Sequence, residues 1–470
     1  MAVALKQPQT IDLRIERLNR TIVNLALPSV LESVLTTMVY FVDTILIARL
    51  NDPVSLAAVG LSSTLMWAAD GLFQAISISA SAMVARFWGQ LDFEAARRVA
   101  GQALILSVLV AVVLMSLLIP VARPFLRLMG AEAAVIDTGT QYVHILLATS
   151  VVSFPLSVAN SIMRATGDTR KPMYITALMN VCNVAAAYAL IFGTGGIPIL
   201  RTVPVLGTIP GLGVRGAALA TSTARTLGGG IALAILFSGK TPIHLRLSHL
   251  RRLDLELIWR MIRISLPNIG ETLISRLGFM LYSRILSALG TVAIAAHQIA
   301  LRVESLAFMP GWGMATAAAA LVGQALGAEK EDIAERGIQR TLLLGNGTMV
   351  LIGAGFVFFA PQIVSLFGVQ HVEMAQMATT VVRISALELY GLCSVMILGG
   401  CLRGAGDTRT PMIVTTAGTF LFRVPITYLF ALALGGGLRG LWLGTAVDWS
   451  MRSLIMLVLY RRGKWKTVEV

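Results

Sequence analysis

The residues best suited to chemistry in this 470-residue sequence are carboxylates that interrupt long apolar stretches. Glu32 and Asp43 lie 11 residues apart in the first stretch, so a helix would carry them on nearly one face, about 16 Å apart along its axis. Asp70 adds an acid in the next stretch. Because an ionised carboxylate is costly to bury in a membrane, we interpret these residues as functional. We expect Asp43 to be the main protonation site.

A second group of polar residues lies within apolar stretches of the later half of the chain. It consists of Glu271, His297, Gln298, Glu304 and Glu388. Carboxylate and amide oxygens are the ligands that hard cations prefer, so Glu271, Glu304 and Glu388 could hold a sodium ion. The arginines of the same half could instead neutralise these acids in pairs. His297 could relay a proton or be a hydrogen-bonded structural histidine.

The composition indicates which elements must position these residues. Hydrophobic residues make up 56% of the chain and charged residues 13%, whereas soluble domains are about 25% charged. A helix of about 20 apolar residues spans a bilayer, and the sequence contains twelve such stretches. They are residues 22–48, 54–85, 95–120, 135–162, 172–193, 213–238, 261–288, 292–323, 337–360, 373–400, 411–435 and 438–460. We predict an all-α polytopic membrane protein with twelve transmembrane helices.

One polar phrase occurs twice, as RATGDTRKPM at 164–173 and RGAGDTRTPM at 403–412, 239 residues apart. The starts of the first and seventh spans, LPSVLES and LPNIGET, match at the same offset. Each half holds six spans, so the halves are parallel repeats, as in some secondary transporters. We expect two six-helix bundles, 1–239 and 261–470, around a central cavity. Residues 240–260 would form an amphipathic linker on the cytoplasmic surface.

The repeated phrase has a local structural interpretation. Its glycine lets the chain turn, and Asp168 or Asp407 can cap the amides of the helix that follows. Arg164 and Arg403 would hold the two loops in the cytoplasm. The alternative is that these residues form gating ion pairs.

The net charge of +14 is explained by topology. Most lysines and arginines lie before the first span, after the last span and in the even-numbered loops, so both termini are expected in the cytoplasm. We expect a multi-pass monomer in the plasma membrane, in contact with the bilayer and not with nucleic acid. The sequence SGKT at 238–241 lacks the earlier glycine of a phosphate-binding loop. Neither an enzyme activity nor a cofactor is predicted.

These motifs resemble those of the multidrug and toxic compound extrusion (MATE) family. The resemblance rests on the doubled R-x-x-G-D-T-R-x-P loop, the VDT that contains Asp43, the NxxN of Asn180 and Asn183, and AAHQI at 295–299. It covers nearly the whole chain. It implies a twelve-helix antiporter that exports organic, often cationic compounds in exchange for protons or sodium ions, with Asn180 and Asn183 supplying hydrogen bonds.

The sequence departs from the family pattern at the candidate ion sites. Many members carry an aspartate where this chain has Ala187, and Glu32 is a candidate replacement for it. Glu271 and Glu388 are each about one helical turn from the acids of the sodium-driven branch. The sequence is therefore compatible with either a proton or a sodium ion as the coupling ion. The alternative function is export or flipping of a lipid-linked or anionic precursor with the same architecture, which the arginines of the second half would favour.

Overall fold

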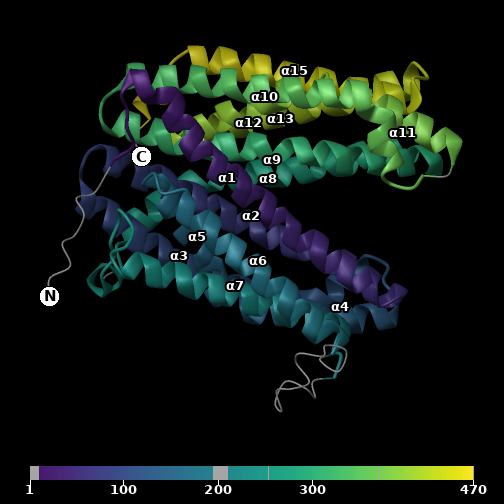
Figure 1. Ribbon diagram of the computed structural model, residues 1–470, viewed down its shortest axis with the longest axis horizontal. Helices are drawn as coiled ribbons and strands as arrows, with labels where there is room; N and C mark the ends of the chain where they lie inside the picture. Colours follow the sequence, from purple (N-terminus) through teal and green to yellow (C-terminus); the bar gives the residue numbers. More distant parts are fainter. Residues whose placement is uncertain (1–9, 194–209, 252, 370, 469–470) are drawn as a thin grey trace. The chain divides into compact units, whose positions relative to one another are not determined.

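The computed structural model describes residues 10–193, 210–251, 253–369 and 371–468 (Figure 1). Every regular element in these ranges is helical, and no β-strand occurs in them. The α-helices are α1 (Leu18–Ala48), α2 (Pro53–Gly89), α3 (Phe93–Leu128), α4 (Ala133–Ala148), α5 (Ser150–Ala165), α6 (Arg170–Phe192), α7 (Gly213–Phe237), α8 (Leu255–Ser287), α9 (Thr291–Gly327), α10 (Glu331–Ser365), α11 (Val372–Ser385), α12 (Leu389–Gly404), α13 (Arg409–Ala417), α14 (Val424–Tyr428) and α15 (Gly437–Arg461).

The predicted all-α membrane fold is confirmed. Eight segments of the described chain are long and apolar enough to cross a membrane, and two bent helix pairs bring the number to ten. The helices α8, with 33 residues, and α15, with 25 residues, are also long enough to span, but they carry several charged side chains. With these two, the described residues supply the twelve predicted spans.

Two of the predicted spans are broken. The pair α4 and α5 bends by 58° at Thr149, and the pair α11 and α12 bends by 50° before Glu388. The Thr149 hydroxyl donates to the carbonyl of Leu146 at 3.1 Å, and the Ser385 hydroxyl donates to the carbonyl of Val382 at 2.8 Å. Such side-chain bonds slightly destabilise a helix and often accompany a bend. The break places the backbone of Glu388 at a helix start inside a span.

The chain divides into two compact units. Unit 1 contains Leu31–Val84 and Phe93–Met261, and unit 2 contains Thr10–Val30, Ala85–Asp92 and Ile262–Val470. Within unit 1, α7 packs against α4, α5 and α6, and α3 packs against α4 and α5. Unit 1 therefore supports the polar residues of α1, α2, α6 and α7 on a packed helical frame.

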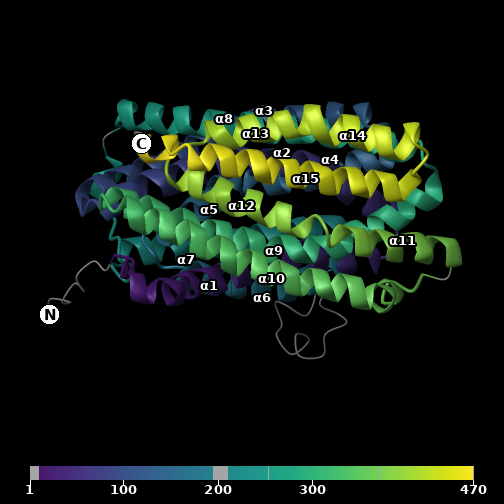
Figure 2. The same cartoon turned by 90° about the horizontal axis from the view of Figure 1, so that it is seen from above.

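Unit 2 is built around α9, which packs against α10, α11 and α12. In this unit, α9 and α10 lie side by side (Figure 2). The α15 helix covers α12. The beginning of α1 also belongs to this unit, because its apolar residues pack against α9 and α10. These residues are Leu18, Ile22, Leu25 and Ala26, which recur at helical spacing on one face. The first helix thus contributes residues to both units.

The eleventh span contains two stretches of widened helix. Gly418–Arg423 and Leu429–Ala433 both have π-helical hydrogen bonding and flank the short helix α14. Single-turn π segments interrupt α-helices rarely and occur mostly at functional sites. Here the first of them carries Arg423 at its end.

The segment 240–260, predicted to be a linker, begins after α7 and includes the short 3₁₀ helix Leu247–Leu250. His249 of this helix lies beside α3, with its Nε2 atom 3.1 Å from Glu94 Oε1. The segment is thus attached to unit 1 by a polar contact.

A glycine in each half lets two helices approach closely. A Cβ on Gly216 of α7 would overlap the carbonyl oxygen of Leu190 on α6. A Cβ on Gly440 of α15 would overlap the carbonyl oxygen of Phe430 in the preceding span. These glycines close the matching sequences GVRG and GLRG. The match therefore reflects one packing requirement that both halves share.

We predict that Gly216→Ala and Gly440→Ala each destabilise the protein by about 1–3 kcal/mol, because backbone atoms cannot move aside for the added methyl group. Gly230→Ala in α7 is the control, since nothing lies within 4 Å of its Cβ position. Thermal unfolding of the detergent-solubilised variants measures the effect. Equal melting temperatures for Gly216→Ala and Gly230→Ala would contradict the packing argument.

Candidate functional site

In unit 1, Asp43 is a buried carboxylate on α1 that interacts with the Thr221 hydroxyl and the Asn183 amide. The Thr221 hydroxyl on α7 donates to Asp43 Oδ2 at 2.8 Å. The Asn183 amide on α6 in turn donates to Thr221 Oγ1 at 3.2 Å. Within the described chain, Asp43 Oδ1 has no hydrogen-bond partner. One oxygen of this carboxylate is therefore available to bind a proton or another small cation.

The two asparagines of α6 add further polar atoms. Asn180 and Asn183 are three residues apart, so they share a helix face. Asn180 Nδ2 donates to the carbonyl of Leu35 on α1 at 2.8 Å. The Oδ1 atoms of both asparagines are buried and have no hydrogen-bond partner in the described residues. Ala187, one turn further on, is buried in the apolar core of unit 1 and supplies no ligand.

Asp70 on α2 lies near an arginine that sequence reasoning did not single out. The Nη1 atom of Arg225 on α7 is 4.0 Å from Asp70 Oδ1. Arg225 follows Thr221 by one helical turn, so the two side chains leave the same face of α7. Arg225 also interacts electrostatically with Asp43. The charge of Arg225 inside a predicted span was a signal in the sequence, whereas nothing in the sequence distinguished Thr221.

Glu32 and Glu271 lie in equivalent ion pairs. Arg164 Nη1 is 2.7 Å from Glu32 Oε1 in unit 1, and Arg403 Nη2 is 2.7 Å from Glu271 Oε1 in unit 2. Each glutamate precedes its arginine by 132 residues. Thr415 also donates to Glu271 at 3.0 Å. Both carboxylates are thus already neutralised inside their own unit, and we call these two pairs the glutamate–arginine clasps.

The repeated loops have the same turn in both halves. Gly167 and Gly406 adopt positive φ values of 91° and 94°, which glycine tolerates best. Asp168 then accepts a hydrogen bond from the amide of Lys171 at 3.2 Å, and Asp407 accepts one from the amide of Thr410 at 2.9 Å. These carboxylates cap α6 and α13 in the way expected of helix-capping residues.

In unit 2, Glu304 and Glu388 form a buried pair of carboxyl groups. Glu304 lies on α9 and is 5% exposed, and Glu388 lies at the break before α12 and is 1% exposed. The two side chains interact with one another, and Thr445 lies against Glu388. Two adjacent carboxyl groups cannot both be ionised without a compensating cation. In addition to Asp43 in unit 1, the protein therefore has a place in unit 2, the carboxyl pair, that can hold a proton or another cation.

The other candidates of the second half do not join that pair. His297 is buried and its Nδ1 atom accepts a hydrogen bond from Trp442 Nε1 at 3.1 Å. Its ring lies 5.6 Å from that of Tyr282, the residue 239 positions after Asp43. Gln298 is exposed on α9. The hydrogen bond to Trp442 fits a structural role for His297.

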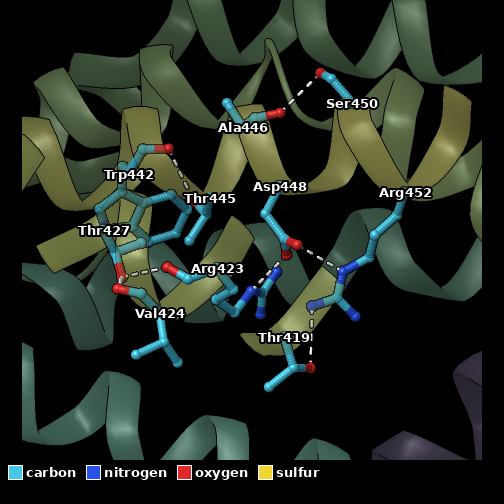
Figure 3. Close-up of polar contacts among 10 residues, drawn as sticks. All are labelled: Thr419, Arg423, Val424, Thr427, Trp442, Thr445, Ala446, Asp448, Ser450 and Arg452. Atoms are coloured by element: carbon cyan, nitrogen blue, oxygen red, sulfur yellow. Dashed lines mark hydrogen bonds and ion pairs between the residues drawn. The ribbon is translucent and has the colours of Figure 1, made fainter. Parts of the chain in front are cut away.

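Figure 3 shows that Asp448 on α15 forms ion pairs with two arginines, Arg423 and Arg452. Arg423 Nε and Arg452 Nε each lie 2.7 Å from one of its carboxylate oxygens. Both guanidinium groups also lie over the Trp449 ring, 5.0 and 5.3 Å from its centre. Asp448 and Arg452 are four residues apart, so they lie one helical turn apart on the same face of α15. Arg423 was missed, although a charge in the middle of a span is itself a signal.

The sequence model of the MatE family matches residues 28–189 and 267–429, once in each half of the chain. The chain belongs to the MatE family. The two matched stretches begin 239 residues apart, which is the offset of the repeated loop. Members of this family are membrane transporters, so the chain is a multi-pass membrane transporter.

Relatives match over most of their length. The chain is 27% identical over 457 residues to "Probable multidrug resistance protein NorM" of Thermotoga maritima, with 96% of this chain and 94% of the relative covered. It is 29% identical over 431 residues to "Multidrug resistance protein NorM" of Burkholderia vietnamiensis, with 89% and 88% covered.

Solved structures have the same fold. "Crystal structure of MATE in complex with MaD3S" superposes with a TM-score of 0.88 at 23% identity, covering 98% of this chain and 100% of that one. "Outward-facing conformation of a multidrug resistance MATE family transporter of the MOP superfamily" superposes with a TM-score of 0.88 at 24% identity and the same coverage. The twelve-helix MATE fold is thereby confirmed.

The clasps generate a stability prediction. We expect Arg403→Met to destabilise the protein by about 3 kcal/mol, because it leaves Glu271 without its partner in a largely buried position. The double variant Glu271→Gln with Arg403→Met should recover much of that loss. Arg123→Met is the control, since its ion pair with Asp137 is exposed and such pairs contribute little. Thermal unfolding is measured for wild type, Arg403→Met, Glu271→Gln, the double variant and Arg123→Met. The account would be contradicted if the effects of Arg403→Met and Glu271→Gln were additive in the double variant.

Proposed function

We propose that this transporter exports organic, mainly cationic compounds in exchange for a monovalent cation, either a proton or a sodium ion. The observation that carries the proposal is Asp43, a buried carboxylate in a span whose Oδ1 atom has no hydrogen-bond partner in the described residues. The names of the relatives, "multidrug resistance protein", support the substrate class. The protein would work as a monomer in the plasma membrane with both termini in the cytoplasm.

The exchange requires only that ion and substrate favour opposite states of the transporter. When Asp43 is ionised, unit 1 carries an uncompensated negative charge that attracts a cation. When a cation occupies Asp43, that attraction is lost. We propose that the halves 1–239 and 261–470, joined by the linker 240–260, alternate between states that open Asp43 to one side of the membrane or the other.

A second candidate function is export or flipping of a lipid-linked or anionic precursor. The observation that favours it is that two arginines, Arg423 and Arg452, pair with the single carboxylate of Asp448, which leaves an excess of positive charge. Such a cluster attracts anions when the neighbouring carboxyl pair of Glu304 and Glu388 is protonated. The cationic substrate is preferred because the free carboxylate oxygen of Asp43 attracts a positively charged compound directly.

The test uses purified protein in liposomes that are loaded with ethidium, a fluorescent cationic dye. A pH gradient and a sodium gradient are imposed separately. We expect one gradient to drive dye movement and Asp43→Asn to reduce it about tenfold or more, because the neutral amide cannot release a proton or bind a cation as strongly. Asp137→Asn, which removes an exposed carboxylate, is the control and should retain activity.

Two outcomes would decide against the proposal. Full activity of Asp43→Asn would remove Asp43 from the mechanism. Movement of carboxyfluorescein, an anionic dye, in the absence of any movement of ethidium would favour the second candidate function.

A further inference from the structure

The linker 240–260 belongs to unit 1 and follows its helix α3. The amide of Asp254 donates to Gln102 Oε1 on α3 at 3.1 Å. A Cβ on Gly101 of α3 would overlap the carbonyl oxygen of His249, so the linker backbone touches this helix directly. Because the linker joins the end of one span, α7, to the start of another, α8, it lies at the membrane surface.

The linker exposes apolar side chains beside the start of α8. Leu247 is 67% exposed and Leu253 is 60% exposed. Leu255 and Trp259 are also exposed, and because they are four residues apart they share a face of α8. Tryptophan concentrates at the headgroup level of a bilayer, so we expect α8 to enter the membrane at this level. Leu253, two residues before α8 begins, then lies next to the lipid headgroups.

Two exposed arginines of the linker lack an acidic partner. Arg246 and Arg251 stand at the two ends of the 3₁₀ helix that contains Leu247. Among the described residues, neither of them forms an ion pair.

The segment before α1 offers a comparison. Arg14 and Arg17 are also exposed, but both pair with Asp12, at 2.8 and 3.8 Å. The linker therefore differs from this segment, because its positive charge is not neutralised by a neighbouring acid in the described chain.

We propose that the linker 240–260 binds anionic phospholipids. Arg246 and Arg251 pair with the lipid phosphate, and the acyl chains cover Leu247 and Leu253. The linker carries five lysines and arginines against two acidic residues, so its charge complements an acidic membrane surface. The exposed leucines favour a lipid over a free phosphate ion, because a phosphate ion has no apolar part to cover them. This contact is independent of the compound and the ion that are transported.

The test uses purified full-length protein in detergent. It is titrated with phosphatidylglycerol and with phosphatidylcholine of the same acyl chains, and native mass spectrometry measures both affinities. Wild type should bind phosphatidylglycerol about tenfold more tightly than phosphatidylcholine. Arg246→Gln with Arg251→Gln should lose most of that preference, because each basic residue near an anionic lipid contributes about fivefold in affinity.

Arg14→Gln with Arg17→Gln is the matched control. It removes the same number of charges from arginines that already have a partner, so it should keep the wild-type preference. The proposal is overturned if wild type binds both lipids equally, if the linker variant keeps the preference, or if the control loses as much of it.

A second variant separates a lipid from a free phosphate ion. Leu247→Gln with Leu253→Gln should weaken the binding of both lipids severalfold, because the acyl chains lose their apolar contacts. Unchanged lipid binding by this variant, or displacement of phosphatidylglycerol from wild type by millimolar inorganic phosphate, would also overturn the proposal.

Discussion

The constraint on which this structure depends is that a charge inside a membrane must be balanced. Most of the charged side chains in the described spans are balanced by an oppositely charged side chain of the protein. The glutamate–arginine clasps neutralise one acid in each unit, and Asp448 is held between Arg423 and Arg452. Asp43 is different, since its hydrogen-bond partner is a neutral hydroxyl. Asp43 is the carboxylate at which the proposed coupling cation would bind.

The two repeats share their frame and differ in their chemistry. The clasps, the glycine turns and the helix breaks recur at the same offset of 239 residues. The residue of unit 2 that is equivalent to Asp43 of unit 1 is the buried Tyr282. At the break in unit 1 stands Thr149, whereas unit 2 has the carboxyl group of Glu388. Duplication therefore preserved the elements that position the sites, while the acids themselves moved.

Much of the fold followed from the sequence because apolar length and repetition are local or periodic signals. The twelve spans and the doubled loop needed no knowledge of distant contacts. The breaks at Thr149 and before Glu388 were not predicted, because no glycine or proline marks either position. Serine and threonine hydroxyls bond back to helix carbonyls at the breaks. They do not identify the breaks in a sequence, because Ser63 and Ser116 make the same kind of bond inside unbroken helices.

The candidate site was predicted only in part because sequence gives the identity of a charged residue and not its partner. Glu32 and Glu271 looked as available as Asp43, yet each pairs with an arginine 132 residues away. Those arginines were visible in the repeated loop, but nothing local connected them to the glutamates. Thr221 and Arg225 were missed because their importance comes from the helices opposite them.

The central claim is that the substrate and the coupling cation compete through Asp43, which binds a proton when no sodium ion is present. The most direct measurement is proton release when ethidium is added to weakly buffered, detergent-solubilised protein that contains a pH indicator. The account predicts that wild type releases about one proton for each ethidium bound at a pH where Asp43 is protonated, and that Asp43→Asn binds ethidium without release. Ethidium binding by wild type with no release of protons, or equal release by Asp43→Asn, would contradict it.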